Sequence, residues 1–213
     1  MNSLHLCNIK AYEKYLLCSH ESPEQLSYPL LVSPKCIEKT GKILYVGQET
    51  NTWGNQDNNE LSVEQLEYLY DSFLKNGATN RPYWKFIKDM IHEPLYDSVV
   101  WTNLLLCGKR DSMGTPEVSK FLFQLSEEYL WNLYQISQPS SVIIMSSPNS
   151  VYKHLIKRFL EKLNCQITEN ISSKQPVLID EQKKIIWTYH PKFLALSKKT
   201  DLVQKSCKQY IMK

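Results

Sequence analysis

The chain has 213 residues, of which 42% are hydrophobic and 22% are charged. This length and composition are typical of one well-buried globular domain, and they exclude a largely disordered chain. The formal net charge of +3 is compatible with nucleic-acid binding but does not indicate it, because many basic enzymes bind no DNA.

Residues 1–41 are expected to form helices that cover a sheet, and four short runs after them predict the strands of that sheet. Each run is almost continuously apolar and rich in β-branched or aromatic residues, as a strand buried on both faces must be. The runs are residues 43–46, 99–102, 142–145 and 185–188.

Three helices are predicted between these strands. Ser62 and Gln65 form a capping box that opens the first, and Gly77 ends it. Thr115 is expected to open the second, because the proline that follows it suits a first helical position. The third is expected to begin at Asn149 or Ser150. Strands that alternate with helices predict an α/β fold. We expect a single domain over residues 1–213, a three-layer α/β/α sandwich with a central, mainly parallel four-stranded sheet.

Polar segments follow all four predicted strands, at the edge of a parallel sheet where ligands usually bind. They are the Gly-Gln-Glu run at 47–49, Asn103, the Ser-Ser-Pro-Asn-Ser run at 146–150, and the His-Pro-Lys-Phe-Leu run at 190–194. The sequence therefore predicts a functional site at this edge.

Each segment offers a different chemical tool, and each also has an ordinary structural interpretation. Glu49 offers a carboxylate for the positive charge that develops on a sugar when a glycosidic bond breaks, or it is a solvated turn residue. Asn103 can pair with a base edge or bond loop backbone. His190 can donate a hydrogen bond to a leaving base or to water. Ser146, Ser147 and Ser150 can bind a phosphate, while Asn149 or Ser150 can also simply cap a helix.

The order of these segments resembles the uracil-DNA glycosylase superfamily. The run at 47–49 is similar to the Gly-Gln-Asp that opens the first motif of the best-known family. Residues 102–107 are similar to the strand that carries the base-reading asparagine, and the run at 190–194 is similar to the closing His-Pro-Ser-Pro-Leu motif. The resemblance covers roughly residues 43–196.

The resemblance implies a role for each matched residue. Glu49 and His190 would be catalytic, the first activating water or stabilising the sugar cation and the second stabilising the departing base anion. Asn103 would read the base edge, with Gln48 and Asn51 beside it.

The resemblance also implies residues that stack on the base and contact the DNA. Leu194 would fill the gap in the base stack, with Phe193 as the alternative wedge. Trp53 is our first choice for the aromatic that stacks on the flipped base, and Trp84 or Phe86 the second.

The chain departs from the family pattern at several positions. Glutamate at 49 is longer than aspartate by about 1.5 Å. Asn51 stands where the best-known family has a tyrosine that excludes pyrimidines with a bulky C5 group. Lys192 replaces a serine and is expected to contact a DNA phosphate. Cys107 lies where related families have an iron–sulfur ligand, but no suitable cysteines flank it, so we expect no metal and no cofactor.

The leading hypothesis is a monofunctional DNA glycosylase that leaves an abasic site. Its base is either a C5-modified cytosine of phage DNA, which gives an antiviral role, or uracil, which gives a repair role. The smaller Asn51 and the polar loop at 51–60 favour the first. A catalytically inactive DNA-binding module of the same fold and an unrelated nucleotide-binding protein are the alternatives. The absence of GxGxxG and GxxxxGK[ST] motifs counts against the latter.

The remaining sequence features concern the environment of the protein. Six cysteines occur without CxxC pairs, which argues against a zinc ribbon or disulfide scaffold and fits reduced thiols. The N-terminal segment has no basic start followed by an apolar core, and no apolar run reaches the length of a membrane span. We therefore expect a soluble cytoplasmic monomer that binds DNA and no membrane.

Overall fold

The computed structural model describes residues 2–21, 25–39, 41–54, 60–77, 81–148 and 150–211. The described residues form a mixed sheet of five strands, with helices on both of its faces. The elements, in chain order, are α1 (Ser3–Glu21), η1 (Pro34–Ile37), β1 (Ile43–Gly47), α2 (Val63–Ser72), η2 (Phe73–Gly77), α3 (Pro82–Lys88), α4 (Leu95–Ser98), β2 (Val99–Asn103), α5 (Lys120–Ser137), β3 (Ser141–Met145), α6 (Ser150–Lys162), β4 (Val177–Asp180), β5 (Ile185–Thr188), α7 (Pro191–Leu196) and α8 (Thr200–Ile211).

The four predicted strands are confirmed as β1, β2, β3 and β5, and they are parallel to one another. Every residue of the four is buried, which explains why the apolar runs are continuous. The sheet order is β2-β1-β3-β5-β4. The expected four-stranded sheet is wrong by one strand, because β4 pairs antiparallel with β5 at the edge. Three of the four β4 residues are only half-buried, and its apolar run of three residues, Val177 to Ile179, ends at the charged Asp180.

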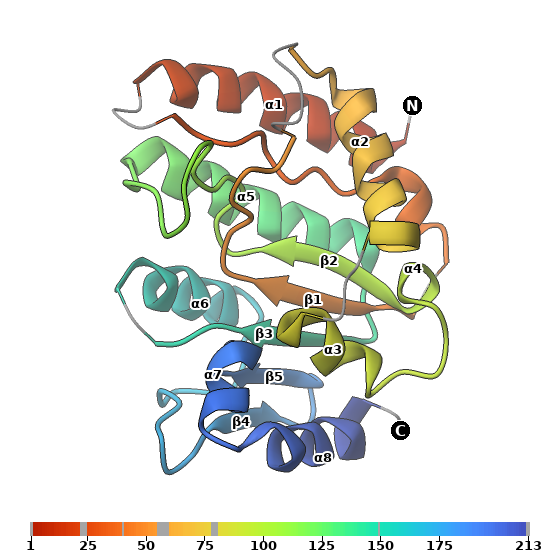
Figure 1. Cartoon of the computed structure of the whole chain (residues 1–213), viewed down its shortest axis with the longest axis vertical. Coiled ribbons are helices and arrows are strands. Elements are labelled where there is room, and N and C mark those ends of the chain that lie inside the picture. The colour runs from red at the N-terminus through yellow and green to blue at the C-terminus, as the bar shows by residue number, and fades with distance from the viewer. Residues whose placement is uncertain are drawn as a thin grey trace.

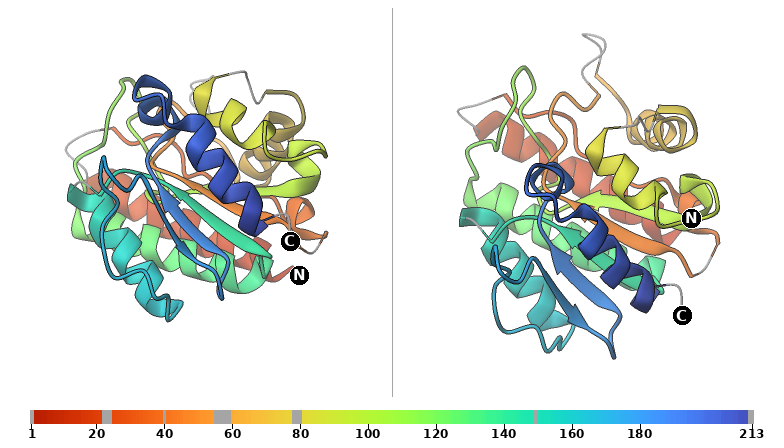
Figure 2. Two further views of the ribbon diagram at one scale, coloured as in Figure 1. Left: turned by 90° about the horizontal axis from the view of Figure 1, so that it is seen from below. Right: turned by 60° about the horizontal axis from the view of Figure 1, so that its bottom comes forward.

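The helices form two layers, one on each face of the sheet (Figure 2). In one layer α5 packs between α1 and α6, and in the other α7 packs against both α3 and α8. The N-terminal cover expected over residues 1–41 is therefore built mainly from α1, which rests on α5.

Local helix signals were accurate at two of the three predicted starts. The capping box of Ser62 and Gln65 opens α2, and α6 begins at Ser150, whereas Asn149 lies outside the described residues. The start expected at Thr115 is wrong, because α5 begins at Lys120 with Ser119 as its N-cap. The Thr115 hydroxyl is instead hydrogen-bonded to Tyr152. Within the described part of the chain, no helix has both the length and the apolar character needed to cross a bilayer.

Candidate active site at the carboxyl edge of the sheet

The residues expected to carry chemistry gather at the carboxyl edge of the parallel strands. β1 and β2 lie side by side with their arrowheads toward the same side, and the loops that follow them lie on that side (Figure 1). Gly47 and Asn103 are register partners at the ends of β1 and β2, and His190 follows β5 by two residues. We predict that one open cleft is lined by Glu49, Asn103 and His190. Tyr83 covers part of this edge, so the open cleft stays a prediction.

Glu49 is half-buried, and its carboxylate interacts with one residue far away in the sequence and with one residue close to it. Its Oε2 accepts a hydrogen bond from the Tyr152 hydroxyl on α6, and the side chain of Asn51 also acts on its carboxylate. Burial raises the pKa of the Glu49 carboxyl, and Tyr152 and Asn51 partly offset this rise. Glu49 is therefore a carboxylate kept partly out of water, which strengthens its interaction with a nearby positive charge.

The Asn51 side chain is hydrogen-bonded to a neighbouring loop. Its Oδ1 accepts a hydrogen bond of 2.8 Å from the backbone N–H of Lys109. The Thr52 N–H donates to the carbonyl of the same lysine at 2.9 Å. Asn51 thus ties the loop after β1 to the loop after β2, and its other side-chain group acts on Glu49.

Asn103 is buried at the end of β2, with 4% of its surface exposed. In the orientation that satisfies its neighbours, its amide oxygen accepts from the Thr50 hydroxyl and from the Thr50 N–H at 3.1 Å. Its amide nitrogen donates to the Thr102 carbonyl at 3.0 Å. Both lone pairs of the oxygen are then used, while one of the two amide N–H donors is left for a ligand.

Tyr83, at the start of α3, closes over this edge. A Cβ placed on Gly47 would lie 2.8 Å from the Tyr83 hydroxyl and against the Asn103 amide, so only glycine fits under them. The Tyr83 hydroxyl is buried without a hydrogen bond to the described residues. The Trp101 side chain is within reach but falls short of hydrogen-bond geometry. On its other side, the Tyr83 ring stacks on His190 with centroids 5.7 Å apart.

His190 is fixed in one tautomer by the helix that it caps. Its Nδ1 accepts the backbone N–H of Lys192 at 3.2 Å, so the neutral ring carries its proton on Nε2. Burial lowers the pKa of His190, and the charge of Lys192 lowers it further. The ring is therefore a neutral hydrogen-bond donor at neutral pH.

The serines after β3 differ in what they can bind. Ser146 is fully buried, and its hydroxyl accepts from Gln48 Nε2 at 3.2 Å and donates to the Ser147 carbonyl at 3.3 Å. The phosphate role expected for Ser146 therefore does not hold, because its N–H still pairs with Thr188 of β5 and its side chain turns inward. Ser147 is half-buried, and the Ser150 side chain lies outside the described residues.

Two of the residues expected to contact a base or the base stack are packed inside the protein. Trp53 is 7% exposed and meets Phe73 and Trp101 edge-on at 5.6 Å. It belongs to an aromatic core cluster that also contains Trp84, and Phe86 is buried in the core as well, so neither of our second choices is accessible. Leu194 is fully buried, so it is not available as a wedge.

The exposed face of α7 carries the other two residues of the closing motif. Lys192 is exposed, and 41% of the surface of Phe193 is exposed. The Phe193 ring contacts Tyr189 with centroids 4.5 Å apart. Lys192, the expected phosphate contact, and Phe193, the alternative wedge, are therefore both accessible on the surface.

Sequence reasoning missed four residues of this edge: Thr50, Tyr83, Thr115 and Tyr152. Only Tyr152 had a usable signal, because it continues the buried α6 stripe of Leu155 and Phe159 toward the end of the helix that lies at this edge. Thr50 and Thr115 lie in loops and Tyr83 lies on the short helix α3, and no local pattern places them at this edge.

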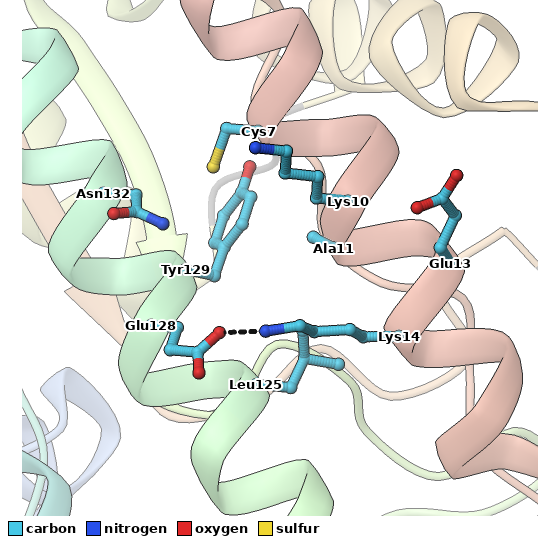
Figure 3. A pocket seen from close by; sticks show the side chains of 9 residues that line it. All are labelled: Cys7, Lys10, Ala11, Glu13, Lys14, Leu125, Glu128, Tyr129 and Asn132. Atoms are coloured by element: carbon cyan, nitrogen blue, oxygen red, sulfur yellow. Dashed lines mark hydrogen bonds and ion pairs between the residues drawn. The ribbon is translucent and has the colours of Figure 1, made fainter.

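A cavity of about 190 Å³ lies elsewhere, between α1 and α5. Its lining includes Cys7, Tyr129 and Asn132, and the ion pair of Lys14 with Glu128 crosses it (Figure 3). Desolvation raises the pKa of the Cys7 thiol, which disfavours a reactive thiolate. None of the residues predicted for the site lines this cavity, which is smaller than most ligand pockets.

No protein-family model matches the chain, and no curated protein matches it either. Among the described residues, no group of three or more His, Cys, Asp or Glu side chains is arranged to hold a metal ion.

Proposed function

We propose that the protein is a DNA glycosylase, which hydrolyses the N-glycosidic bond of a flipped-out pyrimidine and leaves an abasic site. The observation that carries this proposal is His190, whose Nδ1 accepts from Lys192 at the same sheet edge as the Glu49 carboxylate. A neutral imidazole with its proton on Nε2 suits a leaving group that gains negative charge. A partly buried carboxylate suits a sugar that gains positive charge.

The roles follow from the movement of charge in the reaction. The bond between C1′ and the base nitrogen breaks with its electron pair going to the base, and the oxygen of a water molecule bonds to C1′. Glu49 stabilises the sugar cation and takes the proton of that water. The Nε2–H of His190 donates to the oxygen of the departing base anion, which is later protonated from solvent.

Asn103 favours cytosine-type bases over uracil. Its oxygen is bonded twice by Thr50, so the group left for a base is an N–H donor. Cytosine presents two acceptors on its pairing edge, O2 and N3, whereas the N3–H of uracil would need an acceptor that Asn103 no longer offers. A base in this position also requires Tyr83 to withdraw from Gly47. We therefore propose a cytosine, carrying a C5 modification as in phage DNA, as the substrate class and phage defence as the biological role.

The proposed DNA contact is the exposed face of α7. Lys192 lies next to His190, where the phosphates that flank a flipped nucleotide would pass, and Phe193 is the accessible apolar side chain for the gap in the base stack. Because this interaction is electrostatic, the affinity should fall with salt.

The test is base excision from defined DNA. The protein is incubated with oligonucleotides that each contain one uracil, cytosine, 5-hydroxymethylcytosine or glucosylated 5-hydroxymethylcytosine, in single- and double-stranded form. Alkali-labile breaks at the marked position, together with the free base by mass spectrometry, would support a glycosylase. A mobility shift without breaks would support the inactive DNA-binding module instead. If the protein gave no breaks and no mobility shift, both functions would be rejected. Glu49→Gln is the matched control, because it keeps the shape of the side chain and removes its charge.

A further inference from the structure

The surroundings of Glu49 contain a hydrogen-bonded chain that none of the roles above uses. The Tyr152 hydroxyl is the donor to Glu49 Oε2, since an ionised carboxylate can only accept. Tyr152 has one hydroxyl proton, so in its 2.7 Å contact with Thr115 Oγ1 the threonine must be the donor. The direction of the chain is therefore Thr115 to Tyr152 to Glu49.

The three residues come from three different segments, and the fold fixes one of them, Tyr152. Tyr152 is 5% exposed and is anchored in α6, while Thr115 is exposed on the connection between β2 and α5. A tyrosine has few rotatable bonds and Tyr152 is buried in the core, so its hydroxyl is a fixed point. Glutamate has one more rotatable bond than aspartate and needs such a point to hold one geometry.

We infer that Thr115 and Tyr152 are positioning residues, which hold the Glu49 carboxylate in place and ionised for the attacking water. This inference rests on the proposed function. A carboxylate offers about four lone-pair sites, so the bond from Tyr152 leaves room for a water. The side chains that lower the pKa of the Glu49 carboxyl are Tyr152 and Asn51, and those that act on Tyr152 are Glu49 and Thr115.

The test compares Tyr152→Phe with the wild type in the pH profile of base excision. Loss of a hydrogen bond to the charged form raises the pKa of a carboxyl. The acid limb of the turnover profile should therefore move to higher pH by about one unit or more. At the pH optimum, turnover should fall roughly tenfold, since the carboxylate loses its orientation. DNA affinity should stay unchanged, because the proposed DNA contact is the exposed face of α7 and includes neither residue.

Two further variants separate positioning from packing. Thr115→Val should shift the acid limb in the same direction but less, and Thr115→Ser, which keeps the hydroxyl, should restore the wild-type profile. Tyr68→Phe, on an exposed tyrosine of α2 that is 74% exposed, is the matched control and should change nothing. A loss of turnover in Tyr152→Phe without a shift of the acid limb would overturn the inference, as would a wild-type profile.

A measurement without DNA distinguishes this inference from the proposed function. The carboxyl carbon of Glu49 can be followed by NMR in ¹³C-labelled protein, with Glu49→Gln used for assignment. If the wild type cleaves no oligonucleotide, the glycosylase proposal fails. A higher Glu49 pKa in Tyr152→Phe would still show that the chain holds the carboxylate ionised. An unchanged Glu49 pKa would reject the positioning role whether or not the protein is a glycosylase.

Discussion

Gly47→Ala tests the packing on which the whole site depends. The added methyl group would meet the Tyr83 hydroxyl at 2.8 Å and the Asn103 amide, with the Tyr83 Cζ atom at 3.2 Å. Ordinary carbon contacts begin about half an ångström farther away. Both neighbours are held, Asn103 by Thr50 and Thr102 and Tyr83 by its stacking on His190, so neither can move without breaking an interaction.

The expected cost is that of an overpacked core, about 1–3 kcal/mol in the free energy of unfolding. For a domain of this size the melting temperature should fall by about 2–4 °C for each kcal/mol. Urea unfolding at 25 °C, followed by tryptophan fluorescence, measures the free energy directly. Base excision should be lost as well, because the methyl group occupies the room that the flipped base needs.

A double-mutant cycle locates the clash. Tyr83→Phe removes the atom at 2.8 Å and leaves the ring carbon at 3.2 Å. Gly47→Ala should therefore cost less in the Tyr83→Phe background, by roughly 0.5–1.5 kcal/mol. Tyr83→Phe alone should be neutral or stabilising, since it removes a buried hydroxyl without a hydrogen bond. If Gly47→Ala were as stable as the wild type, or if the two changes were strictly additive, the packing described for this edge would be wrong.

The remaining predictions concern the chemistry and the DNA contact. Glu49→Gln should reduce turnover by orders of magnitude while DNA binding is kept, as measured by single-turnover excision and by mobility shift. The same variant should melt at a higher temperature at neutral pH. The pKa of Glu49 is raised in the folded protein, so its ionised carboxylate destabilises the native state at neutral pH, and this destabilisation is lost as the pH falls through the folded-state pKa. Equal melting temperatures of Glu49→Gln and the wild type at neutral pH would contradict the burial argument. His190→Ala should slow excision roughly 10²-fold through the loss of one donor, and wild-type rates would remove His190 from the mechanism. Lys192→Ala should weaken DNA binding and reduce the slope of log affinity against log salt by about 1, whereas an unchanged slope would show that Lys192 contacts no phosphate. Asn51→Tyr should suppress excision of C5-substituted cytosines more than that of uracil, and an unchanged preference would favour the repair role.

The strands and the edge at which the site lies could be read from the sequence, because their causes are local. Residues 43–46 and 185–188 are almost continuously apolar and rich in β-branched and aromatic residues, as a short strand buried on both faces is. The Ser62 capping box is equally local, since its two hydrogen bonds span three residues. Once parallel strands were expected, Glu49 and His190 had to follow them at the same edge. The edge strand β4 was missed because its apolar run has only three residues, Val177 to Ile179, and ends at the charged Asp180.

The partners of the site residues were decided only by the tertiary structure. Nothing near Glu49 in sequence points to Tyr152, 103 positions away, or to Thr115, whose hydroxyl could equally have capped a helix. Ser146 and Leu194 follow strands in the same way as Glu49 and His190 do, yet both turn inward. The reason is that the carboxyl edge of a sheet defines where a segment lies, whereas the direction of each side chain depends on what packs against it. Tyr83 shows this most clearly, because its place over Gly47 comes from α3, an element that pairs with no strand of the sheet.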